Sequence, residues 1–230
     1  MNRRPVDPAL FIRRNTAIER PPLAPEIRLH LATEVTPIWQ ATEESLARNA
    51  LPPPFWAFAW AGGQALARYL LDRPDIVAGR TVLDFGSGSG LVAIAAAMAG
   101  AASVAAAEID PFAAAAIAAN AALNRVAVAV VTEDLLESRR RGWQVVTAGD
   151  VCYEQPMAAR SIAWLRRQAA RGSLVLLGDP GRTYLPADGL RECARYTVPT
   201  SREVEDRDSR EGRVWQVLPA QPPQEPKRPK

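Results

Sequence analysis

The sequence predicts an α/β fold in which a parallel β-sheet carries helices on both faces. From residue 80 onward, short apolar segments alternate with longer helical segments, which is the pattern of βαβ units. At residues 80–100 a buried strand, a glycine turn and an alanine-rich helix follow one another. The chain has 230 residues, enough for one sizeable domain or for one domain with an additional lobe.

Residues 1–50 are predicted to form an N-terminal helical extension outside the βαβ pattern, acting as a cap or a substrate lobe. Two apolar patches flank the pair Pro21-Pro22. Pro25 followed by Glu26 to Leu31 is typical of a helix start, since proline is favoured in the first turn. A second short helix is predicted at residues 42–49.

The next segment, residues 51–74, combines prolines, aromatic residues and glycines. Three prolines exclude a regular helix before Phe55. From Gln64 onward, apolar residues recur with the period of a helix. Phe55 and Phe58 are interpreted as core residues. Trp60 stands beside two glycines where a loop enters this helix, and this position favours packing against a ligand.

The remaining elements follow from apolar runs and turn residues. Strands are predicted at 80–85, 102–108, 126–132, 143–149 and 173–178, and helices at 89–99, 111–123 and 156–170. Asp110 is expected to cap the helix that begins at Pro111. Two final strands are predicted at 196–201 and 213–218, joined by a charged loop. The predicted organisation is therefore an extension (1–50), a catalytic domain (51–218) and a disordered, proline-rich tail (219–230).

The glycines after the first strand predict a nucleotide-like ligand. Gly86, Gly88 and Gly90 alternate with serines, and Asp84 precedes them. Glycine adopts positive φ angles and lets a ligand approach the backbone closely, as in Rossmann-like folds. A turn without a ligand is the simpler alternative, but it does not require three alternating glycines. Leu91 replaces the small residue of a dinucleotide fingerprint, and the absence of Gly-Lys-Ser/Thr disfavours a phosphate-binding P-loop.

Composition and charge exclude several classes of protein. No apolar run approaches the length of a membrane span, and the N-terminal residues MNRRPVDPALFIRRN contain no apolar core of the secretory type. The formal net charge of +3 is accounted for by the terminal KRPK, so the rest of the chain is nearly neutral. This charge distribution does not indicate a nucleic-acid-binding surface. Cys152, Cys193 and the single His30 do not suffice for a metal cluster, so no metal is expected. The two thiols are expected to be reduced, in a cytoplasmic location.

Acidic residues follow three further strands, at the sheet edge where such folds bind ligands. Glu108 follows the second strand and can accept hydrogen bonds from both hydroxyls of a ribose. Glu133 and Asp134 follow the third, and either can reach an adenine amino group. Asp150 and Tyr153 follow the fourth and can converge at the mouth of the site. Capping of the 156–170 helix by Asp150 is the alternative, and the pattern alone does not separate the two.

The chain resembles the seven-strand lysine methyltransferases of the electron transfer flavoprotein β-subunit type over roughly residues 10–218. The resemblance is carried by FIRRNT, by the Trp-x-Gly-Gly run that ends at Gly63, by LDFGSGSG, by Asp-x-x-Tyr at 150–153 and by LLGDPGR. Ala61 departs from the proline usual in that family. The resemblance implies a Rossmann-like, seven-stranded class I methyltransferase fold.

The resemblance also implies S-adenosyl-L-methionine (SAM) as the methyl donor and S-adenosyl-L-homocysteine (SAH) as the product. The cofactor contacts that we predict are Trp60, Asp84, Gly86, Ser87, Gly88, Glu108, Asp134 and Asp150. Asp150 and Tyr153 are the predicted catalytic residues facing the substrate lysine. The implied substrate is the flavoprotein β-subunit or, for bacterial relatives, a ribosomal protein. A monomer that binds neither nucleic acid nor a membrane is expected.

The residues leave alternative functions open. A small-molecule amine or amide N-methyltransferase on the same fold would need an enclosed pocket. A non-catalytic SAM-binding module would tolerate loss of Asp150 and Tyr153, and both are present. An adenine-methylating enzyme is disfavoured because the Asn/Asp-Pro-Pro-Tyr/Phe motif is missing after the fourth strand. A nicotinamide-dependent oxidoreductase is disfavoured by Leu91.

Overall fold

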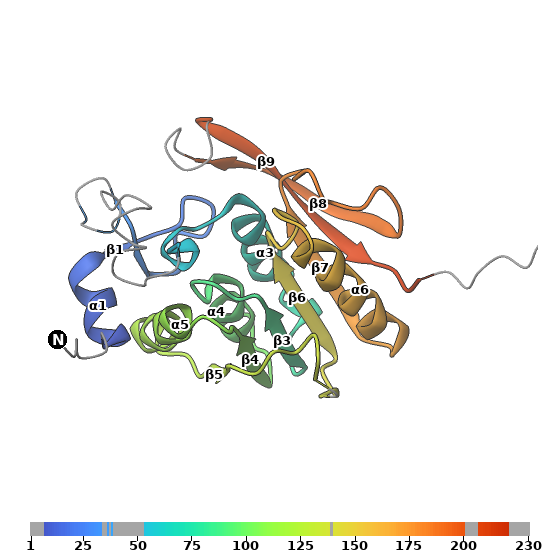
Figure 1. Cartoon of the computed structure of the whole chain (residues 1–230), viewed down its shortest axis with the longest axis horizontal. Coiled ribbons are helices and arrows are strands. Elements are labelled where there is room, and N and C mark those ends of the chain that lie inside the picture. The colour runs from blue at the N-terminus through green and yellow to red at the C-terminus, as the bar shows by residue number, and fades with distance from the viewer. Residues whose placement is uncertain are drawn as a thin grey trace, which may run out of the picture.

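The computed structural model describes residues 7–33, 36, 38, 53–138, 140–200 and 207–220. A seven-stranded sheet forms its centre, in the order β5-β4-β3-β6-β7-β9-β8 (Figure 1). Its strands are β3 (Thr81–Phe85), β4 (Ser103–Ala107), β5 (Ala129–Val131), β6 (Val145–Gly149), β7 (Leu174–Asp179), β8 (Leu190–Pro199) and β9 (Ser209–Val217). The five strands from β3 to β7 are parallel, as predicted, and β9 is antiparallel to both of its neighbours.

Helices cover both faces of this sheet, which confirms the predicted class. On one face lie α3 (Ala61–Asp72), α4 (Leu91–Met98) and α5 (Pro111–Asn124), and on the other lies α6 (Met157–Ala170) (Figure 1). Each face has its own apolar core, one including Leu66 and Ile117 and the other including Trp164 and Leu165. Two short 3-10 helices, η1 (Phe55–Ala57) and η2 (Pro74–Ile76), flank α3. Among the described residues, no helix has the length and apolarity required to cross a bilayer.

The ends of the two strands outside the parallel core differ from the prediction. The last two strands are longer than predicted, because β8 starts at Leu190 and β9 at Ser209. Residues 209–212 of the predicted charged loop are therefore strand, and Glu211 among them pairs with Arg195 on the neighbouring strand β8. Asp110 caps α5 as predicted, since its Oδ1 accepts a hydrogen bond of 2.8 Å from the Phe112 N–H.

The N-terminal extension is helical only in part. It contains α1 (Pro8–Asn15) and an antiparallel pair of strands, β1 (Ala17–Glu19) and β2 (Leu29–Leu31). The helix predicted to start at Glu26 is wrong, because Leu29 and Leu31 alternate with His30 in a strand and bury their side chains. Two asparagines of α5 hold this strand and the residue before it. Asn120 Oδ1 accepts a hydrogen bond from the His30 N–H, and Asn124 Oδ1 accepts one from the Arg28 N–H.

Some predictions for the termini remain predictions. The short helix at 42–49 and most of the predicted tail at 219–230 lie outside the described residues. The domain boundaries near residues 50 and 218 are likewise sequence predictions.

The first turn of α3 lies directly on the carboxyl ends of β6 and β7. A Cβ atom on Gly62 would overlap the carbonyl oxygen of Gly178 in β7 and lie 2.7 Å from Asp150 Oδ2. A Cβ on Gly149, at the end of β6, would lie 3.0 Å from Gly63 Cα. The helix can approach the sheet this closely only because these positions lack side chains.

The glycine contact yields a stability prediction. Gly62→Ala should lower the free energy of unfolding by about 2 kcal/mol or more, because the added methyl group has no space. Gly63→Ala is the matched control in the same helical turn, since its Cβ would lie 3.8 Å from the nearest atom found, Asp150 Oδ2. It should keep or raise stability, because alanine favours helices more than glycine does. Urea denaturation measures both variants, and equal losses would contradict the close-contact explanation.

Candidate functional site

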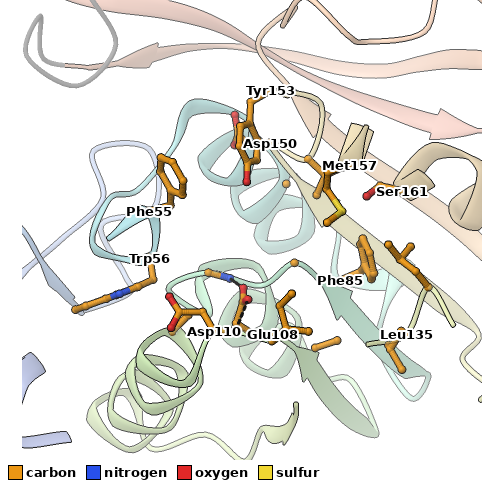
Figure 2. Close-up of a pocket in the computed structure, with 18 of the residues that line it drawn as sticks. Phe55, Trp56, Phe85, Glu108, Asp110, Leu135, Asp150, Tyr153, Met157 and Ser161 are labelled. Atoms are coloured by element: carbon orange, nitrogen blue, oxygen red, sulfur yellow. Dashed lines mark hydrogen bonds between the residues drawn. The ribbon is translucent and has the colours of Figure 1, made fainter. Parts of the chain in front are cut away.

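A pocket of about 500 Å³ opens at the carboxyl edge of the parallel strands. Its walls come from the loops that follow β3, β4, β5, β6 and β7, together with η1 and the start of α6. Figure 2 shows Asp150 and Tyr153 on one side of the cavity and Glu108 and Asp110 on the opposite side. Ligands of open α/β sheets bind at this edge.

The loop between β3 and α4 presents bare backbone to the pocket. Gly86 and Gly88 line the cavity with φ angles of 64° and 54°, in the left-handed region that favours glycine. The N–H groups of Gly86 and Ser87 both donate to the Ala107 carbonyl, which ties the loop to β4. A Cβ on Gly86 would lie 3.3 Å from Val151 Cγ1, so a side chain here would narrow the cavity.

Glu108 joins this loop to the end of β4. Its Oε2 accepts a hydrogen bond of 3.0 Å from the Gly88 N–H, and its Oε1 accepts one of 3.2 Å from the Asp110 N–H (Figure 2). Burial raises the pKa of this carboxyl above its ordinary value, while the two backbone donors oppose the shift. Glu108 lines the pocket, and each carboxylate oxygen keeps a lone pair for a further donor. The residue therefore fits the predicted contact with two ribose hydroxyls.

Asp84 supports the glycine loop from beneath. It is 1% exposed and accepts hydrogen bonds from Ser87 Oγ, the Ala93 N–H and Thr147 Oγ1. Burial raises the pKa of Asp84 to about 6, and the three hydrogen-bond donors oppose this increase. Asp84 and Ser87 do not line the pocket, unlike the other predicted cofactor contacts. Their contacts are those of residues that hold the loop and the start of α4.

The loop after β5 closes one end of the pocket. Glu133, Asp134, Leu135 and Leu136 all line it. Asp134 Oδ1 accepts a hydrogen bond of 2.9 Å from the Leu136 N–H, and Glu133 pairs with Arg140 at 2.7 Å. Asp134 therefore lines the pocket, as an adenine contact would require. Its Oδ1 atom is used by the turn, and the hydrogen bond to Leu136 does not involve its Oδ2 atom.

Asp150 caps a helix, but not the helix considered from the sequence. Its Oδ2 accepts a hydrogen bond of 2.6 Å from the Gly63 N–H in the first turn of α3. The helix that follows it, α6, has Pro156 at its N-cap and no side-chain cap. This contact explains why α3 begins at Ala61, three residues before the predicted start: a carboxylate satisfies an N–H of its first turn. Asp150 itself has a φ of 56°.

Aromatic side chains form the rim on the Asp150 side. The rings of Phe55 and Tyr153 lie 5.5 Å apart, and those of Phe55 and Trp60 lie 6.3 Å apart. Phe55 is 50% exposed and Tyr153 44%, so both are accessible from outside the pocket. The prediction that Phe55 is a core residue is wrong for this reason. Burial raises the pKa of the Tyr153 hydroxyl, which keeps it protonated near neutral pH.

Arg182 is a site residue that the sequence patterns did not reveal. It lines the pocket, and its Nη2 lies 3.0 Å from Asp150 Oδ1. Its guanidinium carbon lies 5.5 Å from the centroid of the Trp60 ring. The position of Pro-Gly-Arg directly after β7 was a usable signal, because every other strand end of the parallel sheet contributes to the pocket. Met157 and Ser161 also line the pocket, and nothing in the sequence of α6 marks them.

Comparison with solved structures places this fold in a known class. The magnesium protoporphyrin IX methyltransferase of Synechocystis PCC 6803, solved with bound SAH, matches 67% of this chain and 80% of its own length. The TM-score is 0.50 at 17% sequence identity, so the likeness concerns the fold. A family model described as ribosomal protein L11 methyltransferase (PrmA) matches residues 64–149. Together with the glycine loop and Glu108, these matches define a class I SAM-dependent methyltransferase.

Closer relatives identify the family. The electron transfer flavoprotein beta subunit lysine methyltransferase of Danio rerio is 39% identical over 212 residues, covering 89% of this chain and 81% of the relative. The protein of the same name from Homo sapiens is 36% identical over 219 residues, with coverages of 91% and 82%. The chain belongs to this family of SAM-dependent protein-lysine methyltransferases.

The raised pKa of Asp84 yields a prediction on pH and stability. Because the folded protein binds this proton more tightly than the unfolded chain, the contribution of Asp84 to stability falls as pH rises from about 4 to about 6. Asp84→Asn should therefore flatten the pH dependence of the unfolding free energy in this range, as measured by urea denaturation. An Asp84→Asn protein with the wild-type slope would show that the carboxyl is not protonated in the folded state near pH 5.

Proposed function

We propose that this enzyme transfers methyl groups from SAM to lysine side chains of the electron transfer flavoprotein β-subunit. The observation that carries the proposal is the pair Asp150 and Tyr153, which lies across the pocket from Glu108 and Asp110 (Figure 2). One wall thus fits a nucleoside, and the opposite wall offers polar groups at an accessible rim. The names of the relatives support the flavoprotein subunit as the substrate.

The residues around the glycine loop fit the cofactor. Glu108 would hold the ribose, Asp134 would reach the adenine, and the bare backbone of Gly86 and Gly88 would allow close approach. Trp60 would offer an aromatic face to positive charge. When bound, SAM supplies an electrophilic methyl carbon: a bond from the acceptor nitrogen forms as the bond to sulfur breaks, with its electron pair leaving on the sulfur of SAH.

The acceptor must reach the site as a neutral amine. A free lysine side chain has a pKa of about 10.4, so the ammonium form dominates near neutral pH. No strong base is required, because a neutral amine is nucleophilic once it is aimed at the methyl carbon. Asp150 would accept a hydrogen bond from the amine and Tyr153 would help to set its direction. Correct placement of this kind contributes several kcal/mol to catalysis.

Two other substrate classes are less well supported. A small-molecule acceptor would favour an enclosed pocket, whereas Phe55, Tyr153 and Ile109 line this one and are 50%, 44% and 60% exposed. A ribosomal protein is suggested by the family model that matches residues 64–149, a segment that ends before Asp150. The monomeric state and the cytoplasmic location remain predictions from the sequence.

A labelling experiment tests the substrate. The purified enzyme is incubated with tritiated SAM and with the flavoprotein β-subunit, ribosomal protein L11 or a small-molecule extract in separate reactions. Label on lysines of the flavoprotein subunit, located by mass spectrometry, is the expected result. The enzyme contains only Lys227 and Lys230, so label on the enzyme itself is readily distinguished. Label only on L11 or only in the extract would overturn the proposal.

The role of Asp150 is tested by Asp150→Asn. We expect kcat to fall roughly 100-fold, since the loss of the carboxylate misplaces the amine, the first turn of α3 and Arg182 together. SAH affinity, measured by calorimetry, should change by less than about tenfold because Glu108 and the glycine loop are intact. Asp188→Asn is the control for a carboxylate lost elsewhere on the surface and should keep full activity. Full activity of Asp150→Asn with normal SAH affinity would exclude the proposed role.

A further inference from the structure

The acceptor side of the pocket contains a permanent cation. Arg182 donates from Nε and Nη2 to the same oxygen of Asp150, at 3.2 and 3.0 Å. Both side chains are largely shielded from solvent, with 17% of the Arg182 side chain and 9% of the Asp150 side chain exposed. A guanidinium stays charged at every physiological pH, so this pair is a carboxylate whose charge is compensated.

Several elements hold Arg182 in this place. Asp179 Oδ1, at the end of β7, accepts hydrogen bonds of 2.7 Å from the N–H groups of both Gly181 and Arg182. The guanidinium lies against Trp60, whose Nε1 donates to the Phe55 carbonyl at 2.8 Å. The backbone is therefore set by β7 and the side chain by the start of α3.

The other charges in the pocket are negative. Among the described residues that line it, Arg182 is the only cation, and the carboxylates are Glu108, Asp110, Glu133, Asp134 and Asp150. Such a cavity attracts a lysine side chain, but it also stabilises the ammonium form, which cannot accept a methyl group. A mechanism that neutralises the carboxylate nearest to the amine removes this obstacle.

The other described groups that face Asp150 are neutral or acidic. On its own loop, burial raises the pKa of Cys152 to about 12 and also raises that of Tyr153, so both stay neutral, and Glu154 is exposed. From β4 and β7 come further carboxylates, Glu108 and Asp179. From α3 comes the Gly63 N–H, a dipole without net charge.

We propose that Arg182 is a positioning residue that keeps the acceptor amine in its neutral form by compensating the charge of Asp150. The ammonium then gives its proton to solvent, and Asp150 orients the resulting amine without holding the proton on it. This inference rests on the proposed methylation of lysine side chains and assigns to Arg182 the control of the protonation state of the acceptor.

The test is the pH profile of kcat at saturating concentrations of both substrates. Arg182→Gln removes the positive charge that lies 3.0 Å from Asp150 Oδ1, so the rising limb of the profile should move to higher pH by about one unit or more. Arg182→Lys keeps the charge and should keep the limb near its wild-type position, at a lower rate. The double variant Arg182→Gln/Asp150→Asn removes both charges and should return the limb toward the wild-type pH.

Asp150→Asn provides a second test in the opposite direction. It removes the negative charge of the carboxylate that would orient the amine, so the limb should move to lower pH even though kcat is reduced. SAH affinity and thermal unfolding of each variant report whether the fold is intact. A merely structural role would lower kcat equally at every pH, and profiles that keep the wild-type limb in both single variants would overturn the inference.

The role of Arg182 and the identity of the substrate are tested separately. The profiles are recorded with whichever protein the wild-type enzyme methylates in the labelling experiment. If the enzyme does not methylate the flavoprotein subunit, the proposed substrate is wrong. If the rising limb of the pH profile stays in place for a substrate that is methylated, only the proposed role of Arg182 is wrong.

Discussion

The architecture of this enzyme depends on one close contact, between the first turn of α3 and the carboxyl ends of β6 and β7. Side chains are missing where the two surfaces meet, at Gly62, Gly149 and Gly178. The contact brings the Gly63 N–H to 2.6 Å from Asp150 and sets Trp60, at the N-cap of α3, beside Arg182. A packing constraint between helix and sheet thereby builds the acceptor side of the pocket.

Buried and partly buried carboxylates position the backbone on both sides of the pocket. Asp84 holds the glycine loop and the start of α4, Glu108 joins that loop to β4, and Asp150 joins β6 to α3. Each carboxylate is satisfied by protein donors, which offset the cost of burying it. Glu108 and Asp150 also line the cavity, so they can use their remaining lone pairs on a ligand. Asp84 does not line it, and its effect on the cofactor would act through the loop.

The sequence predicted what depends on local pattern and missed what depends on distant contacts. The parallel strands and the glycine loop were predictable because apolar runs, Gly86 and Gly88 signal their own conformation. Strand β2 was not, because Asn120 and Asn124 of α5 hold it by hydrogen bonds across 90 and 96 residues of sequence. Likewise, the start of α3 depends on Asp150, and the Arg182–Asp150 pair joins loops that follow different strands. Asp150 was predicted as a site residue, but its contact with α3 was not.

The central claim is that Glu108 holds the nucleoside while the Asp150–Arg182 pair faces the acceptor. A crystal structure of the enzyme with SAH tests it most directly. We expect both ribose hydroxyls on the Glu108 carboxylate, with the Arg182 guanidinium still on Asp150 and both beside the SAH sulfur. A structure in which the ribose lies away from Glu108, or in which Arg182 leaves Asp150 to bind the SAH carboxylate, would contradict it.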